Sequence, residues 1–193
     1  MTVWHWVRHG PTREKTFVGW RDVPADLSDT ARLDRLRAHL PTSALLIASD
    51  LRRASATADA LEGADHRRLE DTAALREFNF GAWDGLPFTE IAERDPDLSR
   101  AYWETPGDVA PPGGESWNAA AERINACVDA INASHPDAQI IAAAHIGVIL
   151  TQVQRALGVS PYQALAHEID NLSCTRIAWA GNMGSVEQIN HCP

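Results

Sequence analysis

The chain has 193 residues, of which 45% are hydrophobic and 22% charged, a composition typical of a globular domain. Its 17 basic and 26 acidic residues give a net charge of −9. This balance argues against a general binder of nucleic acid or of anionic membranes, since both need a broad positive field. We therefore expect a single domain over residues 1–193, in which any anionic ligand is held by a local basic pocket.

The cysteines and the N-terminus bear on the cellular compartment. The three cysteines are widely spaced and form no CxxC pair, which fits a reducing compartment better than a disulfide framework. No run approaches the roughly 18 apolar residues of a membrane span. The N-terminus also lacks the basic start and apolar run of a signal peptide. We expect a cytoplasmic protein with neither a nucleic-acid nor a membrane partner.

Strand-like and helix-like segments alternate along the chain. Continuous apolar runs at 44–48 and 140–144 are typical of strands covered on both faces. This alternation predicts an α/β fold with three layers, α/β/α, around a mostly parallel central sheet. The predicted strands are residues 3–7, 44–48, 140–144, 175–180 and 185–190, the last two forming a hairpin.

Amphipathic segments fall between these strands. A helix is predicted from Ser28, a plausible N-cap, followed by helices over 51–61, 115–133 and 148–157. The segment from about 85 to 114 differs, because it is rich in proline and acidic residues and holds only short helical pieces. We interpret it as an irregular, cap-like excursion over the active-site edge of the sheet. Such segments often supply substrate contacts.

Polar residues follow three of the predicted strands. The first strand runs into Arg8 and His9, Arg52 and Arg53 open the helix after the second, and the strand 140–144 runs into His145. Ligands of open α/β sheets bind outside the carboxyl ends of the strands. Two histidines and at least two arginines could meet there. Arginine matches phosphate oxygens, and a neutral imidazole can attack phosphorus, so this set favours a phosphoryl group.

Five blocks in the same order resemble the histidine phosphatase superfamily, also called phosphoglycerate mutase-like. They are spread over nearly the whole chain. The blocks are VRHGPT at 7–12, SDLRRASATA at 49–58, LREFNFGAWDG at 75–85, PGGES at 112–116 and AHIGVI at 144–149.

The resemblance implies a catalytic role for each of five residues. His9 would be the phosphorylated nucleophile, and Arg8, Arg53 and His145 would hold the phosphoryl oxygens. Glu77 would protonate the leaving group. The family spacing, in which the arginine directly precedes an alanine, selects Arg53. The resemblance implies no metal and no organic cofactor.

Five further residues are predicted to bind substrate: Thr12, Lys15, Trp20, Arg21 and Ile146. For Lys15, Trp20 and Arg21 a solvated loop position is the alternative. Lys15 stands about where many relatives carry an asparagine that touches phosphate. Ile146 stands where the family usually has glycine, and a branched side chain there resists a positive φ and narrows the pocket.

The resulting hypothesis is a phosphatase that hydrolyses a small phosphomonoester through a phosphohistidine. One alternative is a phosphoglycerate mutase, but between residues 83 and 115 the only arginines are Arg94 and Arg100, and the paired arginines of that branch are missing. Another is a catalytically inactive binding protein of the same fold. The excursion is most similar to the α-ribazole phosphatase branch. The expected partner is a small phosphorylated metabolite that the sequence does not name, and a homodimer is possible.

Overall fold

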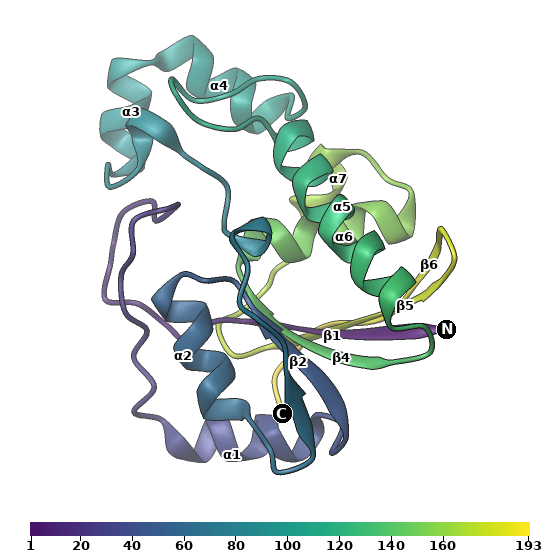
Figure 1. Cartoon of the computed structure of the whole chain (residues 1–193). Helices are drawn as coiled ribbons and strands as arrows, with labels where there is room; N and C mark the ends of the chain where they lie inside the picture. The colour runs from purple at the N-terminus through teal and green to yellow at the C-terminus, as the bar shows by residue number, and fades with distance from the viewer.

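The computed structural model describes residues 1–193, and its six strands form one sheet in the order β3-β2-β4-β1-β5-β6 (Figure 1). Neighbours from β3 to β1 are parallel, whereas β5 is antiparallel to both β1 and β6. The prediction of a mostly parallel central sheet is therefore confirmed. The strands are β1 (Thr2–Arg8), β2 (Ala44–Ala48), β3 (His66–Arg68), β4 (Gln139–Ala144), β5 (Cys174–Ala180) and β6 (Met183–His191).

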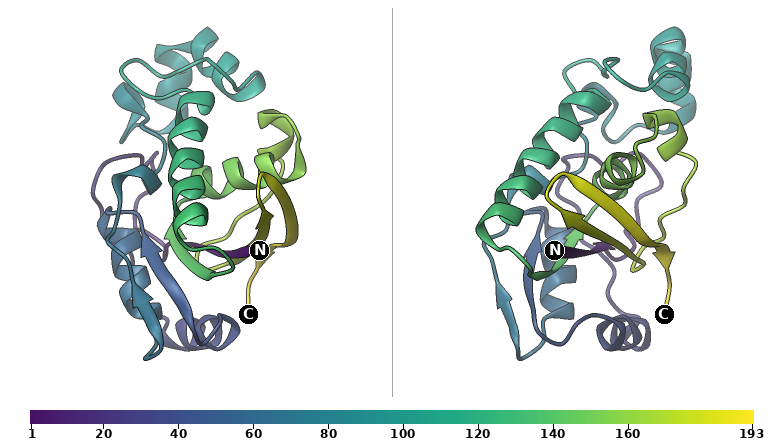
Figure 2. Two further views of the ribbon diagram at one scale, coloured as in Figure 1. Left: turned by 45° about the vertical axis from the view of Figure 1, so that its right-hand side comes forward. Right: turned by 90° about the vertical axis from the view of Figure 1, so that its right-hand side faces the viewer.

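Helices cover both faces of the sheet, which gives the three predicted layers (Figures 1 and 2). Side chains of β4 alternate between two hydrophobic clusters: Ile140 packs on the side of α5 and α6, and Ile141 on the side of α1 and α2. A strand that is covered by helices on both faces must be apolar along its whole length, which explains the apolar run at 140–144. The helices are α1 (Thr30–His39), α2 (Arg52–Leu61), α3 (Phe88–Arg94), α4 (Pro96–Glu104), α5 (Trp117–Ser134), α6 (Ile146–Leu157) and α7 (Pro161–Ala164), with 3-10 turns η1 (Ala73–Leu75) and η2 (Gly81–Trp83).

Among the differences from the sequence prediction are the start of α1, the start of α6 and the strand β3, which was not predicted. Helix α1 is capped by Asp29, whose side chain accepts from the amide of Arg32, while the amide of Ser28 donates to Asp26. Helix α6 begins at Ile146, two residues earlier than predicted. Strand β3 has the sequence HRR and is not buried, so no apolar pattern marked it as a strand.

The predicted excursion holds α3 and α4, which lie at the top of the molecule in Figure 1. It has a small hydrophobic cluster in which Trp83, Ile91 and Tyr102 are buried. The indole N–H of Trp83 donates to Asp95 at 2.8 Å and joins the start of the excursion to its helices. No helix in the structure combines the length and hydropathy that a membrane crossing requires.

The sheet order brings the three polar strand ends together. Strand β4 lies between β1 and β2, with Arg8 opposite Ala144 and Ala48 opposite Ala143. Just beyond the strands, the amide of His9 donates to the carbonyl of Ala144 at 3.0 Å. Residues that are 136 positions apart in sequence, His9 and His145, therefore follow neighbouring strands at one edge of the sheet.

Candidate active site

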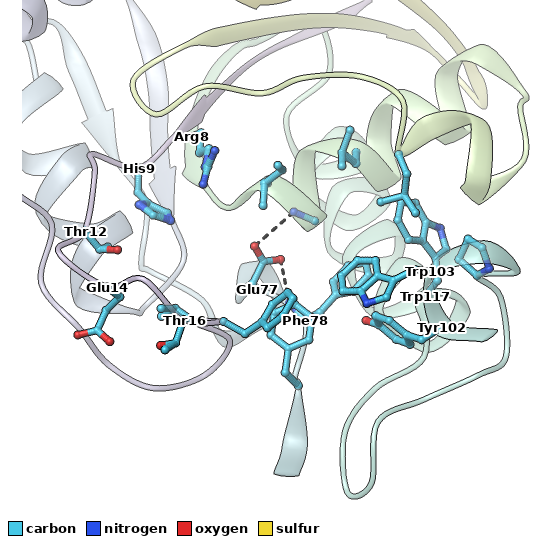
Figure 3. A pocket seen from close by; sticks show the side chains of 18 residues that line it. Arg8, His9, Thr12, Glu14, Thr16, Glu77, Phe78, Tyr102, Trp103 and Trp117 are labelled. Atoms are coloured by element: carbon cyan, nitrogen blue, oxygen red, sulfur yellow. Dashed lines mark hydrogen bonds between the residues drawn. The ribbon is translucent and has the colours of Figure 1, made fainter. Parts of the chain in front are cut away.

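A cavity of about 360 Å³ opens at this carboxyl edge (Figure 3). Arg8 and His9 reach it from the end of β1, Glu77 from the segment after η1, and Ile146 from the start of α6. In Figure 3, Arg8, His9 and Glu77 point toward the same space. The volume lies within the roughly 300–1,000 Å³ typical of small-molecule sites.

His9 is held in one tautomer and orientation. Its Nδ1 donates to the carbonyl of Gly10 at 2.7 Å, so the lone pair is on Nε2. Arg53 Nε donates to that Nε2 at 3.3 Å. Burial, with the cations Arg53 and Arg8 adding to it, lowers the pKa of His9 to about 3, although the hydrogen bond to Gly10 opposes this shift. The imidazole is therefore neutral at pH 7, as a nucleophile must be.

Two arginines lie close to His9, of which Arg53 is fully buried and Arg8 half-buried. Arg53 is only 1% exposed, and besides His9 it donates to the carbonyls of Gly19 at 2.7 Å and Arg21 at 3.0 Å. It lies behind His9 and is not part of the cavity wall. Arg8 lines the cavity, donates to the carbonyl of Ile169 at 2.6 Å, and has a buried Nε without a partner.

His145 completes the basic cluster. Its ring centroid lies 5.1 Å from that of His9, and the two rings are inclined by 60°. The side chain is fully buried, and neither ring nitrogen has a hydrogen-bond partner. Burial, together with nearby Arg53, lowers the pKa of His145 well below its ordinary value. Buried unpaired nitrogens are costly. The ring lies against that of His9 but is not part of the cavity wall.

Glu77 is the one buried carboxylate of the cavity. Its Oε1 accepts from the amide of Phe78 at 2.9 Å, and its Oε2 accepts from the amide of Gly147 at 3.3 Å, the two dashed lines of Figure 3. Burial raises the pKa of Glu77 above its ordinary value, despite these hydrogen bonds and the positive charges of Arg53 and Arg8. A carboxyl group of this kind can carry a proton to a leaving group.

The backbone around Glu77 is fixed by side chains from other elements. Trp20 donates its indole N–H to the carbonyl of Glu77 at 2.8 Å. Arg123 of α5 donates to the carbonyls of Ala74 and Arg76 at 2.9 and 3.1 Å and is paired with Glu115. Sequence reasoning did not identify Arg123, although it is the only cation in the α5 sequence, which is a signal that could have revealed it.

The five predicted substrate-binding residues separate into two groups. Thr12 and Ile146 line the cavity, whereas Lys15, Trp20 and Arg21 do not. Lys15 is exposed, and Arg21 pairs with Asp84 and Glu14. Ile146 has a negative φ as the first residue of α6, so the expected conflict with a branched side chain does not arise.

Comparison with known sequences decides the family. The sequence model of the histidine phosphatase superfamily (branch 1) matches residues 5–191. The chain belongs to this superfamily. A relative is the bifunctional protein Rv2228c of Mycobacterium tuberculosis, 32% identical over 175 residues, which cover 90% of this chain and 46% of the relative. The chain therefore spans about half the length of that relative.

Solved structures of histidine phosphatases share the whole fold. Mycobacterial glucosyl-3-phosphoglycerate phosphatase superposes with a TM-score of 0.85 at 25% identity, covering 99% of both chains. The α-ribazole phosphatase from Shigella flexneri superposes with a TM-score of 0.83 at 19% identity, covering 97% of this chain and 96% of that one, a level that bears on the fold alone. Structural neighbours thus include phosphatases of the branch predicted from sequence.

Proposed function

We propose that the protein is a phosphatase that hydrolyses a small phosphomonoester through a phosphohistidine on His9. The observation that carries the proposal is the pairing of a neutral, oriented imidazole with a buried carboxyl group across one cavity, beside two arginines. His9 Nε2 attacks phosphorus, the bond from phosphorus to the ester oxygen breaks, and Glu77 gives its proton to the departing alkoxide.

The second half of the reaction regenerates the enzyme. Water attacks the phosphohistidine, Glu77 takes a proton from that water, and the bond between Nε2 and phosphorus breaks to release inorganic phosphate. The cations Arg8 and Arg53 and the ring N–H of His145 would hold the phosphoryl oxygens. Arg53 Nε must leave Nε2 for attack to occur, and it is then free to donate to the phosphoryl group.

The first experiment tests the covalent step. The protein is mixed with a reactive aryl phosphate and quenched, and the adduct is mapped by mass spectrometry. We expect an acid-labile, base-stable phosphate on His9 that is lost in His9→Ala. The matched control is His135→Ala, which removes a histidine outside the cavity, at the end of α5. An adduct on another residue, or none in the wild type, would overturn the proposal.

The second experiment separates hydrolysis from transfer and narrows the substrate. A panel of phosphorylated metabolites, including α-ribazole phosphate and 3-phosphoglycerate, is assayed for released phosphate. A hydrolase releases phosphate, whereas a mutase isomerises a phosphoglycerate and a binding protein of the same fold does neither. Arg94 and Arg100 lie outside the cavity and pair with Asp95 and Asp97, so nothing there favours the mutase alternative.

A further inference from the structure

The cavity has two chemically different ends. The end described above carries Arg8, His9 and Glu77, whereas most of the remaining wall is apolar and aromatic. The aromatic side chains come from separate parts of the chain: the loop after β1, the segment around η2, helix α4 and the start of α5. We call this set the aromatic wall; its members are Phe17, Phe78, Phe80, Tyr102, Trp103 and Trp117.

The aromatic wall is packed as a preformed surface. Phe17 stacks on Trp103 with centroids 5.6 Å apart and an interplanar angle of 22°, and it also contacts Phe80 at 5.3 Å. Trp103 meets Tyr102 edge to face at 4.9 Å. On the other side, the indole N–H of Trp117 donates to a glutamine of α6 at 2.7 Å, which fixes that ring. Rings held in this way bind a flat ligand at little cost in entropy.

No second cation faces the cavity beyond the phosphoryl end. Apart from Arg8, His9 and Glu77, the only acidic or basic amino acid in the wall is the glutamate Glu14, which pairs with Arg21 at 3.1 Å. A carboxylate on the substrate would thus meet a carboxylate and aromatic rings rather than a positive partner. Burying such a charge unpaired is strongly unfavourable.

The polar atoms of the aromatic wall are neutral hydrogen-bond donors. Burial raises the pKa of Tyr102, so its hydroxyl stays protonated over the physiological range. The indole N–H of Trp103 is buried and has no hydrogen-bond partner. This end of the cavity therefore suits an uncharged ring.

We propose that the substrate is a phosphomonoester whose alcohol portion carries an uncharged aromatic ring, and that the aromatic wall selects it over esters bearing a second anion. This inference rests on the proposed phosphatase function and names the substrate class of the same site. Trp103 and Phe17 are the residues that determine this specificity. Removing about 100 Å² of aromatic surface from water corresponds to a factor of about 70 in kcat/KM.

The test compares three esters of primary alcohols: 2-naphthylmethyl phosphate, glycerol 3-phosphate and 3-phosphoglycerate. All three esters release an alkoxide, so differences in kcat/KM report mainly on how the rest of each molecule binds. We expect kcat/KM for the naphthylmethyl ester to exceed that for glycerol 3-phosphate by about 70-fold, with 3-phosphoglycerate lowest. Equal values for the three would overturn the substrate class and leave the phosphatase proposal standing.

Substitutions in the aromatic wall test which residues cause the preference for the aromatic ester. Trp103→Ala should lower kcat/KM for the naphthylmethyl ester by about 10-fold or more and that for glycerol 3-phosphate less than about twofold. The matched control is Phe88→Ala, which removes an aromatic ring of the same excursion that is 54% exposed and outside the cavity. If Trp103→Ala does not fold, Phe17→Leu serves in its place. Equal losses on both esters would contradict a role in specificity.

A binding measurement separates the two proposals. Calorimetry compares naphthylmethylphosphonate with methylphosphonate, neither of which can be hydrolysed. If no ester releases phosphate, the phosphatase proposal fails. Tighter binding of the aromatic phosphonate would still support the ligand class, and equal binding would overturn it.

Discussion

Gly147, the second residue of α6, lies so close to Glu77 that an added methyl group should displace the carboxyl group. A Cβ at this position would stand 2.4 Å from Glu77 Oε1 and 2.9 Å from the ring of Phe78. Real Cβ atoms essentially never come within 3.0 Å of such neighbours, so Gly147→Ala must move the carboxyl oxygen by about 0.6 Å, the difference between 3.0 and 2.4 Å.

This displacement should affect chemistry more than folding. A misplacement of about 1 Å can cost roughly 100-fold in rate, so about 0.6 Å should cost on the order of 10-fold. Alanine favours the helix by about 1 kcal/mol over glycine, while overpacking costs about 1–3 kcal/mol. The net loss in the free energy of unfolding is then at most about 2 kcal/mol, and the variant should remain folded.

The assay measures kcat/KM with an alkyl phosphate and with nitrophenyl phosphate. If Glu77 acts as the acid, Gly147→Ala should slow the alkyl ester more, because nitrophenolate leaves without needing a proton. Gly107→Ala is the matched control, since its added Cβ would meet nothing closer than 3.7 Å. An unchanged rate with the alkyl ester in Gly147→Ala, or the same loss in both glycine variants, would refute the reasoning.

Three other predictions concern buried side chains that can ionise. Arg53→Lys should lower kcat/KM by about 100-fold because one ammonium cannot replace a guanidinium that contacts His9 and several carbonyls, whereas the exposed Arg52→Lys should stay within about twofold; equal effects would contradict this assignment. Glu77→Gln should slow phosphorylation of His9 by alkyl esters about 10²- to 10⁴-fold in single turnover and scarcely change that by nitrophenyl phosphate; equal losses would mean a positioning role. His9→Gln should reduce acid sensitivity. The folded-state pKa of about 3 lies below 6.5, so this part of the stability is complete above about pH 6.5 and lost as pH falls toward 3. The loss between pH 7.5 and pH 5 is about 2 kcal/mol, and urea unfolding at these two pH values measures it. If the wild type and His9→Gln lose the same free energy of unfolding between these pH values, the contribution assigned to His9 is wrong.

The sheet and its polar edge could be predicted because their signals are local. The runs at 44–48 and 140–144 are apolar throughout, and both became buried central strands. A residue that directly follows a strand must lie at that end of the strand. The sequence therefore placed His9 and His145 at one edge of the sheet. β3 was missed because it is a three-residue edge strand of polar residues held by pairing with β2.

The aromatic wall could not be predicted, because it depends on contacts between distant residues. Phe17 and Trp103 stack although 86 positions separate them in sequence. Phe17 lies in a loop and Trp103 in helix α4 of the excursion, so neither directly follows a strand that leads to the carboxyl edge of the sheet. Only the packing of α4 over the loop after β1 places Trp103 in the cavity wall. Similarly, nothing local shows that Arg53 lies behind His9 rather than in the cavity wall.

One physical cause, burial, shifts the pKa of both groups in the direction that the proposed reaction requires. It is the leading contribution that lowers the pKa of His9 and raises that of Glu77, so the nucleophile is neutral and the carboxyl group holds a proton more readily than an exposed one. Burial also lowers the pKa of Arg8 and Arg53, yet a guanidinium starts so high that it stays charged. Two positive charges therefore lie beside an uncharged nucleophile. A phosphomonoester dianion would pair with both cations, whereas a neutral ester would leave them without an anionic partner. An overall net charge of −9 is therefore compatible with binding a dianion, because the cations that matter are few and lie close to His9.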